Sequence, residues 1–334
     1  MKYRTLGRTG ALVSEICIGT MTFGKNQWGV GSLGVSEATG FVSCALDQGV
    51  NFFDTADIYA FGESETVLGE ALKGRRDRAV IATKSRIRMS NDPNDAGLSR
   101  RHIMLSCERS LKRLGTDRID LYQIHGWDPV TPFEESLGAL NDLVRQGKVL
   151  YIGVSNWAAW QVAKALGVQD RNGWARFVTL QPFYALTCRD IEVELVPLCL
   201  DQGLGILPWS PLAGGYLTGK YRKGGDGRLA GHIGEFLPVD MAQGERILDA
   251  LDEIGRVHKV NAGQIALAWT RNQPGITSVI IGAKTLAQLQ ENIASAAITL
   301  SAEETQRLNE ASAYRLPYPQ WMIRHQVKEC ELPE

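Results

Sequence analysis

The sequence lacks any run of five or more like charges, and its charges almost cancel. Its 36 Lys and Arg residues oppose 37 Asp and Glu residues, for a formal net charge of -1. A broad basic face for nucleic acid or an anionic membrane surface is therefore missing. No apolar stretch approaches the ~18 residues of a membrane span, and the N-terminus has no apolar signal region. We expect a soluble, cytoplasmic protein that binds neither nucleic acid nor membranes.

Cysteine is also sparse, and its spacing suits neither a redox pair nor a metal site. None of the cysteines forms a C-x-x-C pair, and five of them lie in apolar segments, where a thiol packs as a small hydrophobic group. The six are Cys17, Cys44, Cys107, Cys188, Cys199 and Cys330. We expect reduced, structural thiols and no bound metal.

Short β-branched runs alternate with longer amphipathic stretches, a pattern that is typical of βα units with a parallel sheet. One amphipathic stretch, Ser99–Leu114, ends at Gly115 and is predicted to be a helix. Eight runs are predicted to be strands: Glu15–Ile18, Asn51–Asp54, Ala79–Thr83, Asp120–Ile124, Leu150–Val154, Phe177–Gln181, Gly205–Trp209 and Ser278–Ile281. Eight units favour a closed (β/α)8 barrel over an open sheet, so we expect residues 1–334 to form one such domain.

Three segments depart from this repeat. Met1–Val13 carries two glycines between apolar flanks and is predicted to be a hairpin that closes the bottom of the barrel. Pro211–Val239 holds eight glycines and is expected to be a long ordered loop over the top face. The tail Tyr314–Glu334 is rich in aromatic residues and is a possible substrate loop.

Four chemically active side chains follow three successive predicted strands, at the ends where barrel enzymes place their active sites. The second strand ends at Asp54 and leads into Tyr59, the third continues into Lys84, and the fourth is followed by His125. A phenol has an ordinary pKa near ~10, and a neighbouring ammonium is expected to lower it. Asp54 can hold Lys84 charged, and His125 can orient a carbonyl oxygen. Such a set suits a general acid that protonates a developing alkoxide.

Taken singly, a Tyr or His at a strand end is usually a packed or solvated side chain. Lys84 is more informative, because a lysine that continues the apolar run Ala79–Thr83 is costly to bury without a partner. An alternative is a barrel enzyme of aldolase type that uses Lys84 as a Schiff base. The presence of Asp54 and Tyr59 beside the amine makes this the less favoured interpretation.

Polar and aromatic groups follow the later strands. Ser155, Asn156 and Gln181 offer hydroxyl and amide groups that can hydrogen-bond a carboxamide. The indole of Trp209 can stack on a flat ring, the turn after it can face a pyrophosphate, and Lys220 suits a phosphate.

A helix is predicted to begin after the eighth strand. Thr285 and Gln288 have the spacing of a capping box, which leaves free N–H groups and the positive end of the helix dipole. Lys284 lies beside this end, where it can meet a 2′-phosphate. An exposed capping lysine with no ligand is the alternative.

These residues resemble the aldo-keto reductases, particularly the branch that includes bacterial reductases and potassium-channel β-subunits. The similarity runs from Gly19-Thr20-Met21-Thr22-Phe23-Gly24 to Gln288–Asn292. The resemblance implies that Tyr59 is the proton donor, that Lys84 and Asp54 tune it, and that His125 orients the substrate. It also implies a nicotinamide cofactor that lies extended across the top of the barrel and supplies a hydride.

The resemblance, together with Lys284, leads us to expect NADP(H) rather than NADH. By resemblance, Ser155, Asn156 and Gln181 hold the nicotinamide amide, while Gln288, Glu291 and Asn292 contact the adenosine. The full set of expected cofactor-binding residues is Gly19, Thr20, Met21, Asp54, Ser155, Asn156, Gln181, Trp209, Ser210, Pro211, Leu212, Gly214, Lys220, Gly282, Lys284, Gln288, Glu291 and Asn292.

We therefore expect an NADP-dependent oxidoreductase that interconverts a small-molecule aldehyde or ketone and its alcohol. Aromatic residues predicted to contact the substrate are Trp28, Trp127, Tyr184, Tyr318 and Trp321. The alternative is a cofactor-binding regulatory module of the potassium-channel β-subunit type. The absence of a long extension before Met1 favours a free-standing enzyme. The sequence leaves the oligomeric state and the physiological substrate open.

Two motif matches are rejected on their context. Gly29–Gly34 satisfies G-x-G-x-x-G, but it does not follow its strand immediately, as a Rossmann glycine loop must. Tyr216 and Lys220 match Y-x-x-x-K, which requires one helical face, and the surrounding glycines argue against a helix.

Overall fold

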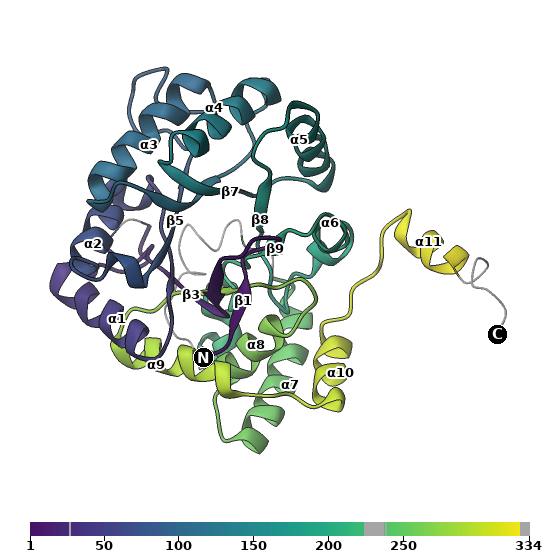
Figure 1. Ribbon diagram of the computed structural model, residues 1–334. Coiled ribbons are helices and arrows are strands. Elements are labelled where there is room, and N and C mark those ends of the chain that lie inside the picture. The colour runs from purple at the N-terminus through teal and green to yellow at the C-terminus, as the bar shows by residue number, and fades with distance from the viewer. Residues whose placement is uncertain (27, 224–236, 238, 328–334) are drawn as a thin grey trace.

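Eight short strands pair in parallel, in the order β10-β3-β4-β5-β6-β7-β8-β9, in a computed structural model that describes residues 1–26, 28–223, 237 and 239–327 (Figure 1). The strands are β3 (Ile16–Gly19), β4 (Phe52–Asp54), β5 (Val80–Ser85), β6 (Ile119–Ile124), β7 (Val149–Ser155), β8 (Phe177–Gln181), β9 (Gly205–Ile206) and β10 (Val279–Ile281). The first and last strands of this order also meet, because Ile206 pairs in parallel with Ile276 and Ile280 N donates to Pro208 O across 3.0 Å. The predicted (β/α)8 barrel is therefore confirmed.

Helices surround the sheet and alternate with its strands (Figure 1). The α-helices are α1 (Val35–Asp47), α2 (Glu63–Ala71), α3 (Arg100–Leu114), α4 (Phe133–Arg145), α5 (Ala159–Asn172), α6 (Leu195–Gln202), α7 (Met241–His258), α8 (Ala262–Arg271), α9 (Leu286–Ala294), α10 (Ala302–Ala311) and α11 (Gln320–Gln326). Short 3-10 helices are η1 (Tyr59–Gly62), η2 (Arg76–Arg78), η3 (Asp190–Glu192), η4 (Ala213–Thr218), η5 (Lys220–Lys223) and η7 (Ser295–Ala297).

Local sequence signals explain where several elements begin and end. The hydroxyl of Ser99 caps α3 by accepting a hydrogen bond from His102 N, and Gly115 ends the helix with a φ of 61°. The helix predicted over Ser99–Leu114 thus begins one residue later, after its cap. β9 is shorter than the predicted Gly205–Trp209, because Pro208 has no N–H to donate to a neighbouring strand.

The interior of the barrel is closed at one end by apolar side chains. A hairpin of β1 (Tyr3–Thr5) and β2 (Leu12–Ser14) pairs in antiparallel fashion and lies across the ring of helices in Figure 1. The buried cluster inside the barrel consists of Leu6, Val13, Cys17, Phe52, Ala82, Leu121, Leu207 and Ile280. Since the hairpin supplies Leu6 and Val13, it fills this end, and the polar groups of the strands lie at the other.

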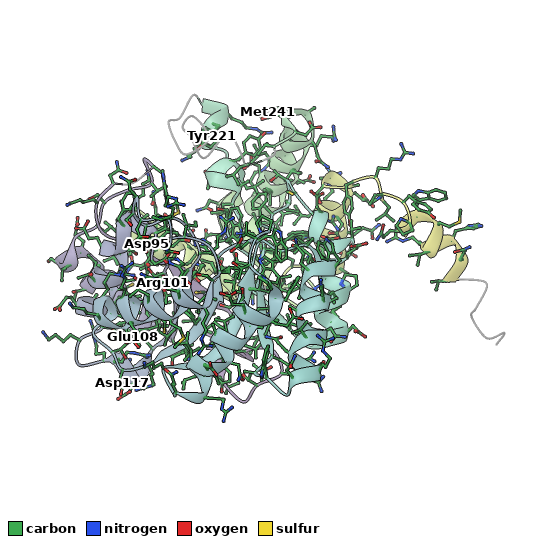
Figure 2. The ribbon with its side chains drawn as sticks, turned by 90° about the horizontal axis from the view of Figure 1, so that it is seen from above. Asp95, Arg101, Glu108, Asp117, Tyr221 and Met241 are labelled. Carbon is green, nitrogen blue, oxygen red and sulfur yellow. The ribbon has the colours of Figure 1, made fainter. Side chains whose placement is uncertain are left out.

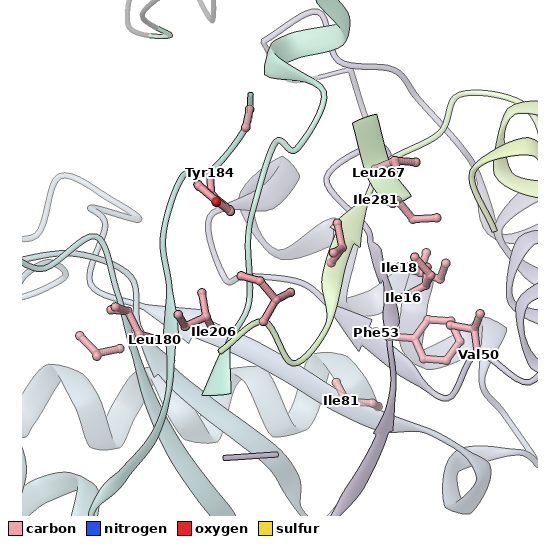
Figure 3. Close-up of a cluster of buried hydrophobic side chains, with 14 of the residues drawn as sticks. Ile16, Ile18, Val50, Phe53, Ile81, Leu180, Tyr184, Ile206, Leu267 and Ile281 are labelled. Atoms are coloured by element: carbon pink, nitrogen blue, oxygen red, sulfur yellow. The ribbon is translucent and has the colours of Figure 1, made fainter. Parts of the chain in front are cut away.

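A second and larger apolar layer joins the outside of the sheet to the helices. Figure 3 shows Ile16, Ile18, Phe53 and Ile81 of the strands in this layer, together with Leu267 of α8. Their side chains alternate with those that face the barrel interior, because successive residues of a strand point to opposite faces. The alternation fixes which strand residues can reach the polar end.

The described part of the C-terminal tail, up to residue 327, does not cover the barrel as a substrate loop would. In both views α11 projects away from the ring of helices (Figures 1 and 2). Tyr318 and Trp321 are 74% and 48% exposed. The composition of the tail indicated its aromatic character but not its direction, which depends on contacts far away in sequence.

Parts of two predicted segments lie outside the described residues. These are residues 224–236 and 238 of the predicted loop Pro211–Val239, and residues 328–334 of the tail, which include Cys330. The five described cysteines are free thiols. Within the described ranges, no helix is long and apolar enough to cross a membrane, and no group of three or more His, Cys, Asp or Glu residues is arranged to hold a metal ion.

Candidate active site

A buried lysine lies at the centre of the polar end of the barrel. Lys84 of β5 is 0% exposed, and its ammonium donates to Asp54 Oδ2 at 2.5 Å, to the Thr55 carbonyl at 2.8 Å and to Tyr59 Oη at 3.4 Å. Asp54 ends β4, the strand beside β5. The charge that would be costly to bury alone therefore has a carboxylate and two oxygen acceptors.

Tyr59 reaches this group through an unusual turn. It begins η1, in which Ala60 and Phe61 have φ values of 48° and 52°, in the left-handed region that L-residues rarely adopt. The turn places the Tyr59 ring 5.0 Å from Lys84 Nζ and 5.9 Å from the ring of His125, which it meets edge to face. The structure thus brings together all four side chains that were predicted from the strand ends.

Burial raises the pKa of the Tyr59 phenol above its ordinary value. The charge and hydrogen bond of Lys84 act in the opposite direction, and Asp54 offsets part of the Lys84 effect. The ammonium therefore acts in the expected direction, but the burial of the phenol, which the sequence does not show, outweighs it. At neutral pH the phenol keeps its proton.

The pKa values of Lys84 and His125 shift in opposite directions. Burial alone would lower the pKa of Lys84, but Asp54 and Tyr59 outweigh it and raise the pKa. Burial lowers the pKa of His125 well below its ordinary value, and the positive charges of Lys84 and Arg86 add to this effect. The site therefore contains a charged lysine and a neutral imidazole at neutral pH.

Two glutamine amides complete the layer of polar groups around Asp54. Its second oxygen, Oδ1, accepts hydrogen bonds from Gln181 Nε2 at 2.8 Å and from Gln123 Nε2 at 3.3 Å. Sequence reasoning missed Gln123. Strand alternation could have found it, because Gln123 lies two residues before His125 on the face of β6 that contains Leu121.

The residues expected to hold a carboxamide are hydrogen-bonded to neighbouring strands and turns. Asn156 donates from Nδ2 to the His125 carbonyl at 3.1 Å, and its Oδ1 accepts from Trp209 Nε1 at 3.1 Å. Ser155 donates to the carbonyl of Gln181 at 2.7 Å, so its hydroxyl is occupied within the barrel wall. Asn156 thus joins the Trp209 indole to the backbone of His125.

Trp209 has an aromatic neighbour that sequence reasoning missed. The ring of Phe183 lies 5.0 Å from that of Trp209 and is tilted by 36°. Phe183 comes two residues after the end of β8 and pairs in parallel with Trp209. No pattern along the chain distinguished it from other apolar residues.

The turn after Trp209 has strained backbone. Ser210 and Ala213 have φ values of 50° and 48°, which only a well-supported turn allows for residues with a side chain. Lys220 Nζ lies 4.9 Å from the centre of the Tyr221 ring. Tyr216, of the rejected Y-x-x-x-K match, donates to Glu245 Oε1 at 3.3 Å from a 3-10 turn.

The neighbouring residues of this turn are Pro211, which is buried, and Leu212 and Gly214, with a φ of 66° at Gly214.

The G-x-G-x-x-G loop Gly29–Gly34 also lies on this side of the barrel. Its Val30 is buried with Leu237 against Met21, Phe183 and Trp209. A Cβ atom on Gly31 would lie 3.6 Å from Lys284 Cγ.

The start of α9 lies exposed after β10. Thr285 Oγ1 accepts from Gln288 N at 3.3 Å, as in a capping box. The reciprocal bond differs from the prediction, because Gln288 Oε1 accepts from Lys284 N rather than from Thr285 N. Asn292 donates to the Gly282 carbonyl at 3.2 Å, and Glu291 is exposed on the same helix.

Residues at the end of β3 are occupied in joining strands. Gly19 is in register with Asp54, and Thr20 N donates to the Asp54 carbonyl at 2.9 Å. Thr20 Oγ1 lies 2.9 Å from Ser64 Oγ, so this hydroxyl supports the turn that follows Asp54. The buried Glu65 next to it accepts from Thr83 and from Arg113, another pairing that the sequence did not indicate.

The predicted substrate residues do not lie together. Tyr184 is 1% exposed, stacks on Trp269 and donates to Glu192, so in this structure it is a core residue. The ring of Trp127 packs among aromatic residues at the side of the barrel. Trp28 is 39% exposed in the loop after β3.

A further carboxyl, that of Asp57, is buried at this end of the barrel. Asp57 lies between Asp54 and Tyr59, is 1% exposed, and neither of its oxygens has a hydrogen-bond partner among the described residues. Burial raises its pKa well above the ordinary value, and the charge of Glu65 adds to this shift. The raised pKa favours the protonated, neutral form of this carboxyl.

Comparisons with known proteins match nearly the whole chain. The model of the aldo/keto reductase family matches residues 15–313. The chain is 40% identical to an uncharacterized oxidoreductase, YrpG, of Bacillus subtilis, over 93% of this chain and 95% of that protein. It is 34% identical to versiconal hemiacetal acetate reductase of Aspergillus parasiticus, over 96% and 99% of the two chains. It is also 39% identical to a probable voltage-gated potassium channel subunit beta of Arabidopsis thaliana, over 88% and 90%.

Proposed function

Because this chain belongs to the aldo/keto reductase family, we propose that it reduces an aldehyde or ketone to the alcohol with NADPH, and that Tyr59 is the proton donor. The observation that carries the proposal is the buried contact of Lys84 with both Asp54 and Tyr59, with the His125 ring opposite. Family membership supports the oxidoreductase class, and this geometry supports the roles within it.

The residues around the polar end of the barrel fit a nicotinamide dinucleotide. The amide of Asn156 contacts the His125 backbone, the amide of Gln181 contacts Asp54, and the Trp209 indole gives a flat surface next to Asn156. The turn after Trp209 and the exposed start of α9 offer backbone N–H groups that suit phosphates. A bound reduced nicotinamide would supply the hydride that the carbonyl carbon accepts.

The proton path follows from the pKa shifts. Tyr59 Oη holds a proton at neutral pH and donates it to the carbonyl oxygen as negative charge develops there. The phenolate that remains is stabilised by the Lys84 ammonium at 3.4 Å, and Asp54 keeps that ammonium charged and in place. In alcohol oxidation the same proton moves in the opposite direction.

His125 positions the carbonyl in this proposal. Its imidazole is neutral because burial and two neighbouring cations lower its pKa, so it can donate one hydrogen bond without competing with Tyr59 for the proton. The Asn156 bond to its carbonyl oxygen and the edge contact with Tyr59 fix its backbone and ring. Two donors would thus converge on one carbonyl oxygen.

The preference for NADPH rests on Lys284. It lies beside the exposed N-terminus of α9, where its positive charge would add to the helix dipole and favour a 2′-phosphate. Gln288, Glu291 and Asn292 lie on the same helix and would contact the adenosine.

The proposal is tested by following NADPH and NADH consumption over a panel of aromatic aldehydes, dicarbonyls and sugar-derived carbonyls. Cofactor binding is measured in parallel from the quenching of tryptophan fluorescence. We expect both NADPH binding and carbonyl-dependent oxidation of NADPH. NADPH binding with no turnover of carbonyls or alcohols would contradict the reductase proposal.

That negative result would favour a second function, a cofactor-binding regulatory module. The 39% identity to a plant potassium channel subunit beta is the observation behind it. A membrane protein that copurifies in stoichiometric amount would support it.

A further inference from the structure

The candidate active site contains a second cation that the proposed proton transfer does not use. Arg86 follows β5 two residues after Lys84, and its guanidinium donates from Nε at 3.1 Å and from Nη2 at 2.6 Å to the carbonyl of Trp127. A Cβ atom on Gly126 would lie 3.9 Å from Arg86 Nε. The side chain thus crosses from the end of β5 to the chain segment that directly follows His125.

The backbone of Arg86 is held in a costly conformation. Its φ of 145° lies in the region that residues with a side chain rarely adopt. Gly97 N holds it there by donating to the Arg86 carbonyl at 2.8 Å. Strain of this kind is typical of functional positions. Here the side chain reaches the Trp127 carbonyl, near enough to His125 for its charge to act on the imidazole.

Arg86 has no carboxylate partner among the described residues. Two other partly buried arginines do have one, since Arg76 pairs with Asp120 and Arg113 pairs with Glu65. The Asp128 carboxylate, which follows Trp127, is occupied by Leu98, Val130 and Thr131 instead. The remaining guanidinium N–H groups of Arg86 therefore have no protein acceptor in the described part of the chain, although the side chain is half-buried.

The neighbouring charges leave this cation uncompensated. Asp54 already balances the charge of Lys84, and the His125 imidazole is neutral. The positive charge of Arg86 is therefore the one that remains near His125 at the polar end of the barrel. A planar guanidinium with free N–H groups recognises a carboxylate through two parallel hydrogen bonds. A substrate that carries a carboxylate would supply the anion that the protein does not.

We propose that Arg86 forms a subsite for a carboxylate, so that the preferred substrates are carbonyl compounds that also carry a carboxylate group, such as oxo acids and aldehyde acids. The inference rests on the proposed reductase function, because it names the substrate class of the same site. Arg86 is a specificity residue in this account, and it has no part in the proton transfer.

The test compares 3- and 4-carboxybenzaldehyde with their methyl esters, which keep the aldehyde and the ring but remove the charge. We expect the wild-type protein to show a higher kcat/KM for the acid, mainly through a lower KM. Arg86→Gln should lower the acid-to-ester ratio of kcat/KM by about 10- to 100-fold, the value of a charged hydrogen-bond pair. Arg86→Lys keeps the positive charge but lacks the planar guanidinium with its paired N–H groups. This variant should retain part of the acid-to-ester ratio that Arg86→Gln loses.

Arg88→Gln is the matched control. Arg88 is exposed in the same loop and donates to the carbonyls of Ser90 and Asp92, so the acid-to-ester ratio should not change. An equal loss of acid and ester turnover in Arg86→Gln would show that Arg86 only supports the loop, and it would overturn the proposal. A wild-type ratio of one or less would overturn it too.

Calorimetry separates this inference from the proposed function. Benzoate and benzamide are titrated into the protein in the presence of saturating NADPH, which requires no turnover. We expect benzoate to bind at least about 10-fold more tightly than benzamide, and this difference should disappear in Arg86→Gln. Arg86-dependent binding of benzoate without reduction of any carbonyl would refute the reductase and keep the anion subsite. Equal binding of the two ligands would refute the subsite.

Discussion

The ammonium nitrogen of Lys84 lies 3.4 Å from the phenol oxygen of Tyr59. The two residues are 25 positions apart in sequence, and each is held by a different constraint: Lys84 by its place within β5, and Tyr59 by a turn with two left-handed residues. A buried cation at this distance stabilises the phenolate only as the proton leaves, which is when a general acid needs it.

Replacement of Lys84 by Met should affect both activity and stability. Asp54 would keep a buried charge without its cation, at a cost of about 3–5 kcal/mol, and carbonyl reduction should fall by about 100-fold or more. Thermal unfolding and steady-state kinetics measure the two effects. The double variant Asp54→Asn/Lys84→Met should recover much of the stability but not the activity. A single variant with unchanged melting temperature and turnover would contradict the account.

The pH dependence of carbonyl reduction follows from two pKa shifts. Reduction needs a protonated Tyr59, whose pKa lies above 10, and a neutral His125, whose pKa lies well below 6.5. We therefore expect kcat/KM for reduction to be level between about pH 7 and pH 9 and to fall only above about pH 10. A loss of activity on the acid side with an apparent pKa near 6.5 would show that His125 titrates in the ordinary way.

Asp57→Asn should stabilise the protein increasingly as the pH rises. The folded pKa of Asp57 lies above its unfolded value, so the folded state holds a proton that the unfolded state releases, and stability falls with pH between the two values. Asn removes this loss, which amounts to about 1.4 kcal/mol for each pH unit in that interval. Melting temperatures at pH 4, 6 and 8 measure it. The difference from wild type should grow from pH 4 to pH 8, and a constant difference would exclude titration of Asp57.

Lys284→Ala should weaken the preference for NADPH over NADH by about 10-fold, because a charged contact with the 2′-phosphate is lost. The ratio of kcat/KM for the two cofactors measures this preference. Lys73→Ala, at an exposed residue of which the side chain is 79% accessible, is the control. An unchanged ratio in Lys284→Ala would remove Lys284 from the cofactor site.

The strands and the four central side chains could be predicted because both depend on local pattern. β-branched runs mark the strands, and parallel strands bring their carboxyl ends to one face of a barrel. β8 coincides with its predicted range, Phe177–Gln181, and Lys84 is as buried as its apolar run implied.

Other features could not be predicted because they depend on packing across the fold. The direction of the tail, the burial of Tyr184 and the pairing of Glu65 with Arg113 join segments far apart in sequence. The rise in the pKa of Tyr59 could not be predicted for the same reason, since burial is a property of the whole barrel. Likewise, no local sequence pattern indicates the strained backbone conformation of Arg86.

The most direct test of the central claim compares Tyr59→Phe with Tyr122→Phe. Both changes remove one phenol hydroxyl from the barrel, but Tyr122 donates to Ser85 Oγ at 2.8 Å and has no part in the proposed proton transfer. With NADPH and an aromatic aldehyde, Tyr59→Phe should lose at least about 100-fold in kcat while still binding NADPH, and Tyr122→Phe should keep most of its activity. Equal activity of Tyr59→Phe and the wild type would contradict the assignment of Tyr59 as the proton donor.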